Sequence, residues 1–185
     1  MVMVKETAWK WIDDHHDQLT EISDKVWGYA ELGLVETKSS KLITEVLERH
    51  GFDVQLGVAG MPTAIYATWG KGEPTIGFQG EYDALPGISN KVKPKKDPLV
   101  PGAPGHSWAF VACAGSTIGH KSLVFAAKAM AGAALEALTD ENLRNAFKKE
   151  HKERLKGRTY KTPLPEGLQP PLEIARENWE KIPKQ

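Results

Sequence analysis

The clearest candidates for chemistry lie in the run Gly80-Glu-Tyr-Asp-Ala-Leu-Pro-Gly87, where two carboxylates stand two positions apart. The preceding residues 75–79 predict a strand, so Glu81 and Asp83 should emerge at its carboxyl end, where open α/β sheets gather ligands and catalytic groups. In an extended segment, side chains at i and i+2 point to the same side. Such a pair can bind a divalent metal or orient an imidazole that does, and a solvated turn explains the same spacing equally well.

Two histidines are further candidates. His106 ends a proline-rich loop beside a glycine and can approach a metal closely, although a loop histidine bonded to backbone is the more common arrangement. His120 is predicted on the first turn of an apolar helix, where it can contact a substrate anion beside the helix N–H groups. A packed core histidine fits that position equally well. The adjacent pair His15 and His16 diverges by about 100° on a helix and therefore cannot bind one metal.

The elements that position these candidates include several predicted helices. Apolar residues recur at spacings of three, four and seven over residues 9–30, which indicates a helix. A second helix is predicted over 39–50, and Gly51 is suited to end it in the left-handed conformation. An Ala-rich helix over about 118–138 is apolar nearly all round, which predicts that it is buried. A charged helix should follow it over 140–156.

The pattern between these helices changes to a period of two. Residues 52–56, 63–69 and 75–79 are short, rich in β-branched and aromatic types, and separated by Gly and Pro, so they predict three strands. Five prolines interrupt residues 86–104, which predicts a long loop without regular structure. Helices and strands in this order indicate a mixed α/β layer structure formed by a single domain over residues 1–185.

Composition excludes several classes of protein. The chain has 185 residues with 24 basic and 24 acidic side chains, so it lacks the basic excess of a nucleic-acid-binding protein. Its longest apolar run, 123–138, is shorter than the roughly 20 residues that a bilayer needs, so no membrane partner is expected. The start lacks the apolar segment of a secretory signal, and the single cysteine, Cys113, allows no internal disulfide. A cytoplasmic location is therefore expected.

Four runs stand in a fixed order: Val26-Trp-Gly-Tyr-Ala-Glu-Leu-Gly33 with Glu36, Gly57-Val-Ala-Gly-Met-Pro-Thr-Ala64, Gly80-Glu-Tyr-Asp-Ala-Leu-Pro-Gly87 and Pro98-Leu-Val-Pro-Gly-Ala-Pro-Gly-His106. Together they resemble the amino-terminal part of the metal-dependent amidohydrolases, which include aminoacylases and carboxypeptidases. The similarity is greatest to the branch of aminobenzoyl-glutamate utilisation proteins. The later runs His106-Ser-Trp108, Ala112-Cys-Ala-Gly-Ser-Thr-Ile-Gly-His-Lys121 and Thr162-Pro-Leu-Pro-Glu-Gly167, with the Ala-rich helix, resemble the carboxyl-terminal segment of the same proteins. The chain therefore looks like two ends, 1–105 and 106–185, with the middle missing.

This resemblance implies a fold and a set of roles. The fold would be a three-layer αβα domain of the zinc-peptidase type, shortened and without the inserted dimerisation domain. Asp83 matches the family aspartate that orients a ligand or bridges metals, and Glu81 takes a place that other branches fill with a metal-binding histidine. These two would be the catalytic carboxylates. His106 matches the histidine that completes the metal site or, alternatively, the first histidine of the metal-binding run that is missing here. The implied cofactor is a divalent metal, zinc or manganese.

Two functions follow from these observations. The resemblance implies a metal-dependent hydrolase of amide bonds in N-acyl amino acids or small peptides, with His120 contacting the substrate. The family's other metal ligands and its general base have no counterpart in this chain, which predicts impaired activity. The alternative is a non-catalytic α/β scaffold or a remnant that self-associates, because loss of an inserted domain leaves apolar surface exposed. A homo-oligomer is compatible with both.

Overall fold

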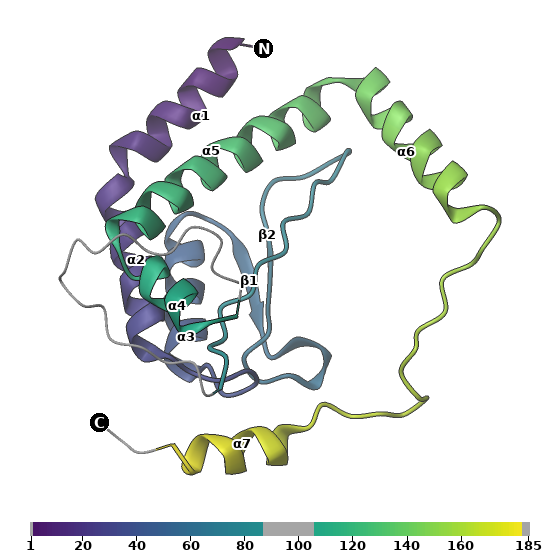
Figure 1. The fold of residues 1–185 in the computed structure, drawn as a ribbon. Coiled ribbons are helices and arrows are strands. Elements are labelled where there is room, and N and C mark those ends of the chain that lie inside the picture. Colours follow the sequence, from purple (N-terminus) through teal and green to yellow (C-terminus); the bar gives the residue numbers. More distant parts are fainter. Residues whose placement is uncertain (1, 87–105, 183–185) are drawn as a thin grey trace. The chain divides into compact units, whose positions relative to one another are not determined.

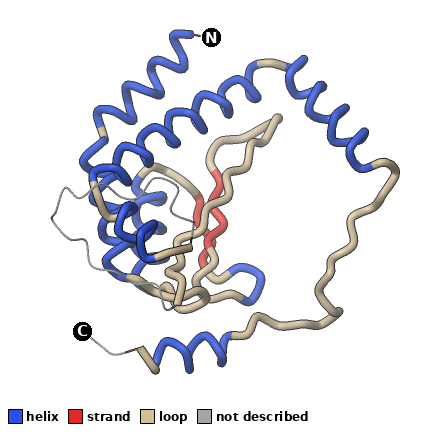
Figure 2. Tube along the Cα trace, in the orientation of Figure 1, coloured by secondary structure: helices blue, strands red, loops and turns tan. Residues whose placement is uncertain are grey.

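The computed structural model describes residues 2–86 and 106–182, in which helices predominate (Figures 1 and 2). The described residues form two units, which are treated separately below. Unit 1 consists of Met1–His15, Gly72–Gln79 and Val124–Gln169, and unit 2 of His16–Lys71, Gly80–Leu123 and Pro170–Gln185. The elements in chain order are α1 (Val2–Asp14), α2 (His16–Tyr29), α3 (Thr37–Arg49), β1 (Asp53–Leu56), the 3-10 helix η1 (Val58–Gly60), β2 (Ile65–Thr68), α4 (Trp108–Ala114), α5 (Thr117–Thr139), α6 (Glu141–Leu155) and α7 (Leu172–Glu180).

Unit 2 contains a small antiparallel sheet of β1 and β2. The register pairs Asp53 with Thr68 and Leu56 with Ile65. Both strands lie inside predicted ones, so two of the three predicted strands are confirmed. The third prediction, residues 75–79, is wrong: the segment is drawn as a loop (Figure 2). No described backbone pairs with it, and β propensity alone does not make a strand without a neighbour to accept its hydrogen bonds.

The helices of unit 2 are joined by backbone contacts as well as side chains. The indole N–H of Trp27 on α2 donates to the carbonyl oxygen of Val111 on α4 at 2.9 Å. The turn from α4 into α5 is so tight that a Cβ on Gly119 would overlap the carbonyl oxygen of Ala114. Glycine is therefore required at position 119 by close approach of the backbone.

The helix predicted over residues 9–30 is divided into α1 and α2 at His15. The Nδ1 atom of His15 lies 2.8 Å from the carbonyl oxygen of Trp11, and the two rings stack with centroids 3.9 Å apart. His15 thus contacts the last turn of α1, whereas the adjacent His16 pairs with Asp17 at the start of α2. The two histidines therefore have different partners.

In unit 1, α1 packs along α5 in the antiparallel direction. Lys5 forms an ion pair with Glu136, and Lys128 forms one with Asp13 at 2.6 Å. Between these pairs the indole N–H of Trp9 donates to the carbonyl oxygen of Lys128 at 2.9 Å. The glycine at position 132 is buried and lets the Trp9 ring approach α5.

The prediction that the Ala-rich helix is buried is wrong. Of the described residues of α5, only Gly132 and Ala137 are buried, and Phe125 is 76% exposed. The helix has 23 residues and is long and apolar enough to cross a membrane by length and composition, with 11% of its most apolar window buried. One such helix is weak evidence of a span, because core helices of soluble proteins meet the same criterion.

At the level of class, the mixed helix and sheet content agrees with the predicted α/β protein. The three-layer αβα arrangement implied by the resemblance remains a prediction. The proline-rich loop falls almost entirely on residues 87–105, outside the described residues.

Candidate functional site

A short turn before α3 brings the predicted carboxylate Asp83 to the rest of unit 2. Leu32 and Ala84 form a parallel bridge, and the backbone N–H of Ala84 donates to the carbonyl oxygen of Glu31 at 2.7 Å. The turn is bounded by Ala30 and Leu34, whose φ angles of 47° and 71° lie in the left-handed region. Non-glycine residues hold such angles only where the surroundings enforce them, so this turn is a constrained part of the fold.

Glu31 caps the amino end of α3 from outside the helix. Its carboxylate accepts the backbone N–H groups of Lys38 and Ser39, both at 2.9 Å, and the hydroxyl of Ser39, also at 2.9 Å. The side chain is 2% exposed. The N-cap residue Glu36 forms no capping bond itself, so Glu31 supplies the negative charge that the helix amino end favours. All of this carboxylate's bonding serves the fold.

A second buried carboxylate, Glu36, belongs to a chain of hydrogen bonds. The hydroxyl of Thr63 donates to Glu36 Oε2 at 2.6 Å, and the phenol of Tyr82 donates to the carbonyl oxygen of Thr63. Burial raises the pKa of Tyr82 to about 12, and the nearby negative charge of Glu36 acts in the same direction. Tyr82 is therefore a neutral hydrogen-bond donor throughout the physiological range.

Asp83 and Glu36 approach each other around Gly33. A Cβ on Gly33 would lie 3.7 Å from Asp83 Oδ2 and 4.0 Å from Glu36 Oε1. We call these three residues the Gly33 site. Asp83 is exposed whereas Glu36 is buried, so one carboxylate faces solvent and the other is held by Thr63. Glu81, the other predicted catalytic carboxylate, is also exposed, at the segment that leads into the site.

The two candidate histidines have different surroundings. His106 is exposed, with a φ of 60°, directly before the N-cap residue of α4. His120 lies on the first turn of α5, as predicted, and its Nε2 atom is 2.7 Å from Asp24 Oδ1 on α2. This pair joins two helices of unit 2, so the imidazole already has a partner within the protein. The substrate-binding role of His120 remains a prediction.

The metal implied by the resemblance does not fit the described residues. Within 2–86 and 106–182, no group of three or more His, Cys, Asp or Glu side chains is arranged to hold a metal ion. Glu36 belongs to the Gly33 site and Glu31 precedes Gly33 by two residues, but their oxygens accept hydrogen bonds from Thr63 and α3, respectively. A zinc site needs about three protein ligands, and the Gly33 site offers two carboxylates. The described residues therefore do not supply the metal site that the resemblance implies.

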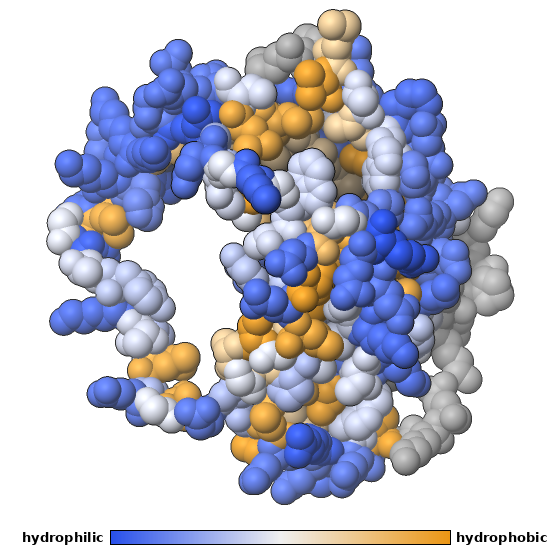
Figure 3. All heavy atoms as spheres, turned by 180° about the vertical axis from the view of Figure 1, so that it is seen from behind, coloured by the Kyte–Doolittle hydropathy of each residue, from blue (hydrophilic) through white to orange (hydrophobic). Residues whose placement is uncertain are grey.

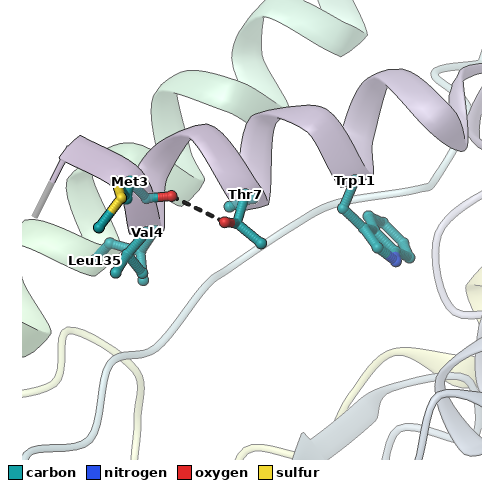
Figure 4. A pocket seen from close by; sticks show the side chains of 6 residues that line it. Met3, Val4, Thr7, Trp11 and Leu135 are labelled. Atoms are coloured by element: carbon teal, nitrogen blue, oxygen red, sulfur yellow. Dashed lines mark hydrogen bonds between the residues drawn. The ribbon is translucent and has the colours of Figure 1, made fainter.

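Unit 1 has a separate open groove, of about 560 Å³, between the start of α1 and the end of α5 (Figure 4). Its lining is apolar apart from Thr7, whose hydroxyl donates to the carbonyl oxygen of Met3 at 2.9 Å. Apolar side chains also reach the surface elsewhere, as the orange areas of Figure 3 show. The groove lacks titratable groups, so it offers no catalytic chemistry. Its lining residues are Met3, Val4, Thr7, Ala8, Trp11 and Leu135.

Comparison with known proteins gives two relatives. The chain is 33% identical over 106 residues to one of the subunits of p-aminobenzoyl-glutamate hydrolase from Escherichia coli (strain K12), covering 55% of this chain and 22% of the relative. It is 36% identical over 72 residues to thermostable carboxypeptidase 1 of Saccharolobus solfataricus (strain ATCC 35092 / DSM 1617 / JCM 11322 / P2), covering 38% of this chain and 18% of the relative. No protein-family profile and no solved structure matches the chain.

Part of this chain is related to amidohydrolases and peptidases. The predicted resemblance is confirmed at that level, and the matches span about a fifth of each relative's own length. Sequence reasoning gave no role to Glu31, Glu36, Thr63 and Tyr82, although three of them lie in the runs that carry the resemblance and Glu36 follows the first of those runs. The sequence signal for these four residues is a polar type in or just after a run that carries the resemblance, and their burial is visible only in the fold.

Proposed function

We propose that this chain acts in the hydrolysis of amide bonds of acyl-amino acids or small peptides, with the Gly33 site as its reactive centre. The observation that carries the proposal is the similarity to two proteins that are both hydrolases by name. The convergence of Asp83 and Glu36 around Gly33 supports it. An exposed carboxylate can take a proton from a water molecule that attacks the amide carbon, and can return that proton to the leaving nitrogen as the C–N bond breaks, which gives a free carboxylate and an amine.

Each carboxylate has a distinct part in this proposal. Asp83 is exposed and acts as the general base, and Glu81, two residues earlier, contributes a second exposed negative charge. Glu36 is held by the Thr63 hydroxyl, and the Tyr82 phenol supports the same segment through the Thr63 carbonyl. Glu36 and Tyr82 therefore position the site and do not exchange protons during turnover.

The experiment is a hydrolysis assay of the purified chain against N-acyl amino acids, with p-aminobenzoyl-glutamate included because the first relative is named for it. Asp83→Asn should lower kcat by at least about tenfold, and Asp53→Asn, at an exposed aspartate of β1, should leave it unchanged. Equal activity of the two variants would exclude Asp83 as the base. Bound zinc and manganese are measured in the same preparation, with and without a chelator, because the resemblance implies one of them.

A second function has its own supporting observation. The two buried carboxylates of unit 2, Glu31 and Glu36, both accept structural hydrogen bonds, and the described residues assemble no metal ligand set. These features favour a non-catalytic scaffold that keeps only part of the hydrolase framework. Absence of turnover on every substrate, including after zinc or manganese is added, would support the scaffold and overturn the hydrolase.

A further inference from the structure

Residues 75–79 are a strand-forming segment that has no partner strand among the described residues. The sequence Thr-Ile-Gly-Phe-Gln is rich in β-branched and aromatic types, yet none of its backbone groups bonds to described backbone. Phe78 is 62% exposed, and Thr75, Gly77 and Gln79 are exposed as well. An exposed segment of strand-favouring residues with unpaired backbone groups can pair with another such segment.

The local charges allow two copies of the segment to meet. Residues 74–80 carry no charge, in a chain where 26% of residues are charged. Lys71 and Glu73 precede the segment, and Glu81 and Asp83 follow it. Parallel pairing would place the four carboxylates of Glu81 and Asp83 from two copies side by side. Antiparallel pairing centred on Gly77 places Lys71 of each copy opposite Asp83 of the other and Glu73 opposite Glu81. Parallel pairing places only like charges opposite each other, so charge favours the antiparallel direction over the parallel one.

The segment is also self-complementary about its central residue. Antiparallel pairing centred on Gly77 places Ile76 opposite Phe78 of the other copy, twice over, which is a favourable aromatic–aliphatic pair. When Gly77 forms the hydrogen-bonded pair, Ile76 and Phe78 form the closer, non-hydrogen-bonded pairs. Pro74 then also falls in a non-hydrogen-bonded position, so its missing N–H is not needed.

We propose that two copies of this chain associate by pairing residues 75–79 as antiparallel strands centred on Gly77. Residues 75–79 of one copy would thus pair with residues 75–79 of a second copy, and a two-fold axis would relate the two copies. This interface goes beyond the proposed hydrolysis and does not depend on it. A chain without catalytic activity would form the same dimer.

Cysteine cross-linking tests the register directly in a Cys113→Ala background. Across an antiparallel pair the two Cα atoms at position 77 are about 5.5 Å apart, within the reach of a disulfide. Residue 80 pairs with residue 74, so the two copies of position 80 are about 20 Å apart. A Cβ at Gly77 or Gly80 meets no described atom within 4 Å, so both substitutions suit the monomer and form a matched pair.

Gly77→Cys should form a disulfide-linked dimer under mild oxidation, and Gly80→Cys should remain uncross-linked. Equal cross-linking of the two variants, or none by Gly77→Cys, would overturn the register. Both variants are compared at the same concentration, with reduced samples as the control for non-covalent aggregates.

Sedimentation equilibrium tests the association without a cross-link. Phe78→Glu should raise the dimer Kd by about tenfold, since it removes both Ile76–Phe78 pairs. The control is Phe125→Glu, at another solvent-exposed phenylalanine, on α5, which should leave the Kd unchanged. A wild-type chain that stays monomeric at its highest soluble concentration would overturn the proposal. So would a dimer that Phe125→Glu dissociates and Phe78→Glu does not, because the α5 face would then be the interface.

Discussion

At the amino end of α3 the buried side chains are polar and hydrogen-bonded, whereas along α1 and α5 large apolar side chains remain exposed. Glu31, Ser39 and Thr63 are buried in the first region. Met3 and Phe125 are exposed in the second. The first region is fixed by directional bonds that only one arrangement satisfies. The second depends on a few ion pairs at partly exposed positions, which contribute little stability. The candidate site is built on the better-defined of the two.

The largest effect is expected from Glu31→Ala. The substitution leaves the N–H groups of Lys38 and Ser39 without their acceptor in a buried place, which should lower the free energy of unfolding by about 3 kcal/mol. Urea unfolding followed by circular dichroism measures the change. Glu48→Ala, at an exposed position on the same helix, is the control and should change stability by less than about 0.5 kcal/mol. Similar losses for the two variants would show that the Glu31 cap contributes nothing specific.

A smaller loss is expected from Gly119→Ala at the turn between α4 and α5. The new methyl group would overlap the Ala114 carbonyl oxygen and lie 2.8 Å from that of Cys113, so backbone must move. We expect a loss of about 1–3 kcal/mol, measured by the same unfolding experiment. Unchanged stability would show that α4 does not pack against the start of α5 in solution.

Tyr82 tests whether the hydrogen-bonded region is as buried as the structure shows. Its raised pKa means that the folded state keeps the phenol proton above about pH 10, where the unfolded chain has lost it. Below about pH 10 the Tyr82 phenol is neutral in both the folded and the unfolded chain, so this group does not make the free energy of unfolding depend on pH there. The free energy of unfolding should fall as the pH rises from about 10 to about 12, because only the unfolded chain loses the proton. Absorbance titration of tyrosinate should show one transition near pH 12 that Tyr82→Phe removes.

Glu36→Gln provides the control for the cause of that shift. Burial and the Glu36 charge both raise the pKa of Tyr82, and burial is the larger cause. Glu36→Gln removes only the charge, so the Tyr82 transition should move to lower pH without reaching about 10. A transition already at about pH 10 in the wild type would contradict the burial of Tyr82.

The sequence predicted the local elements better than their environment. Periodicity located α3 and both strands, and an Ala-rich apolar composition located α5, because each signal is carried by neighbouring residues. It failed at residues 75–79, where a strand needs a partner that sequence periodicity cannot supply. It also failed at α5, since an apolar composition predicts burial only when something covers the helix. The role of Asp83 rests on its motif and stays a prediction, whereas the role of Glu31 depends on α3 folding back onto it.

The smallest effect should have the opposite sign and comes from Gly132→Ala, on the same helix as Gly119. A Cβ at position 132 would lie 3.5 Å from the Trp9 ring, an ordinary van der Waals distance, so no atom has to move. Alanine in a helix interior is favoured over glycine by about 1 kcal/mol, and the added methyl packs on the indole, so unfolding should require more urea. If Gly132→Ala destabilised the chain as Gly119→Ala does, α1 and α5 would be packed as tightly as the turn between α4 and α5, and the α1–α5 region would not be the loosely held one of the comparison.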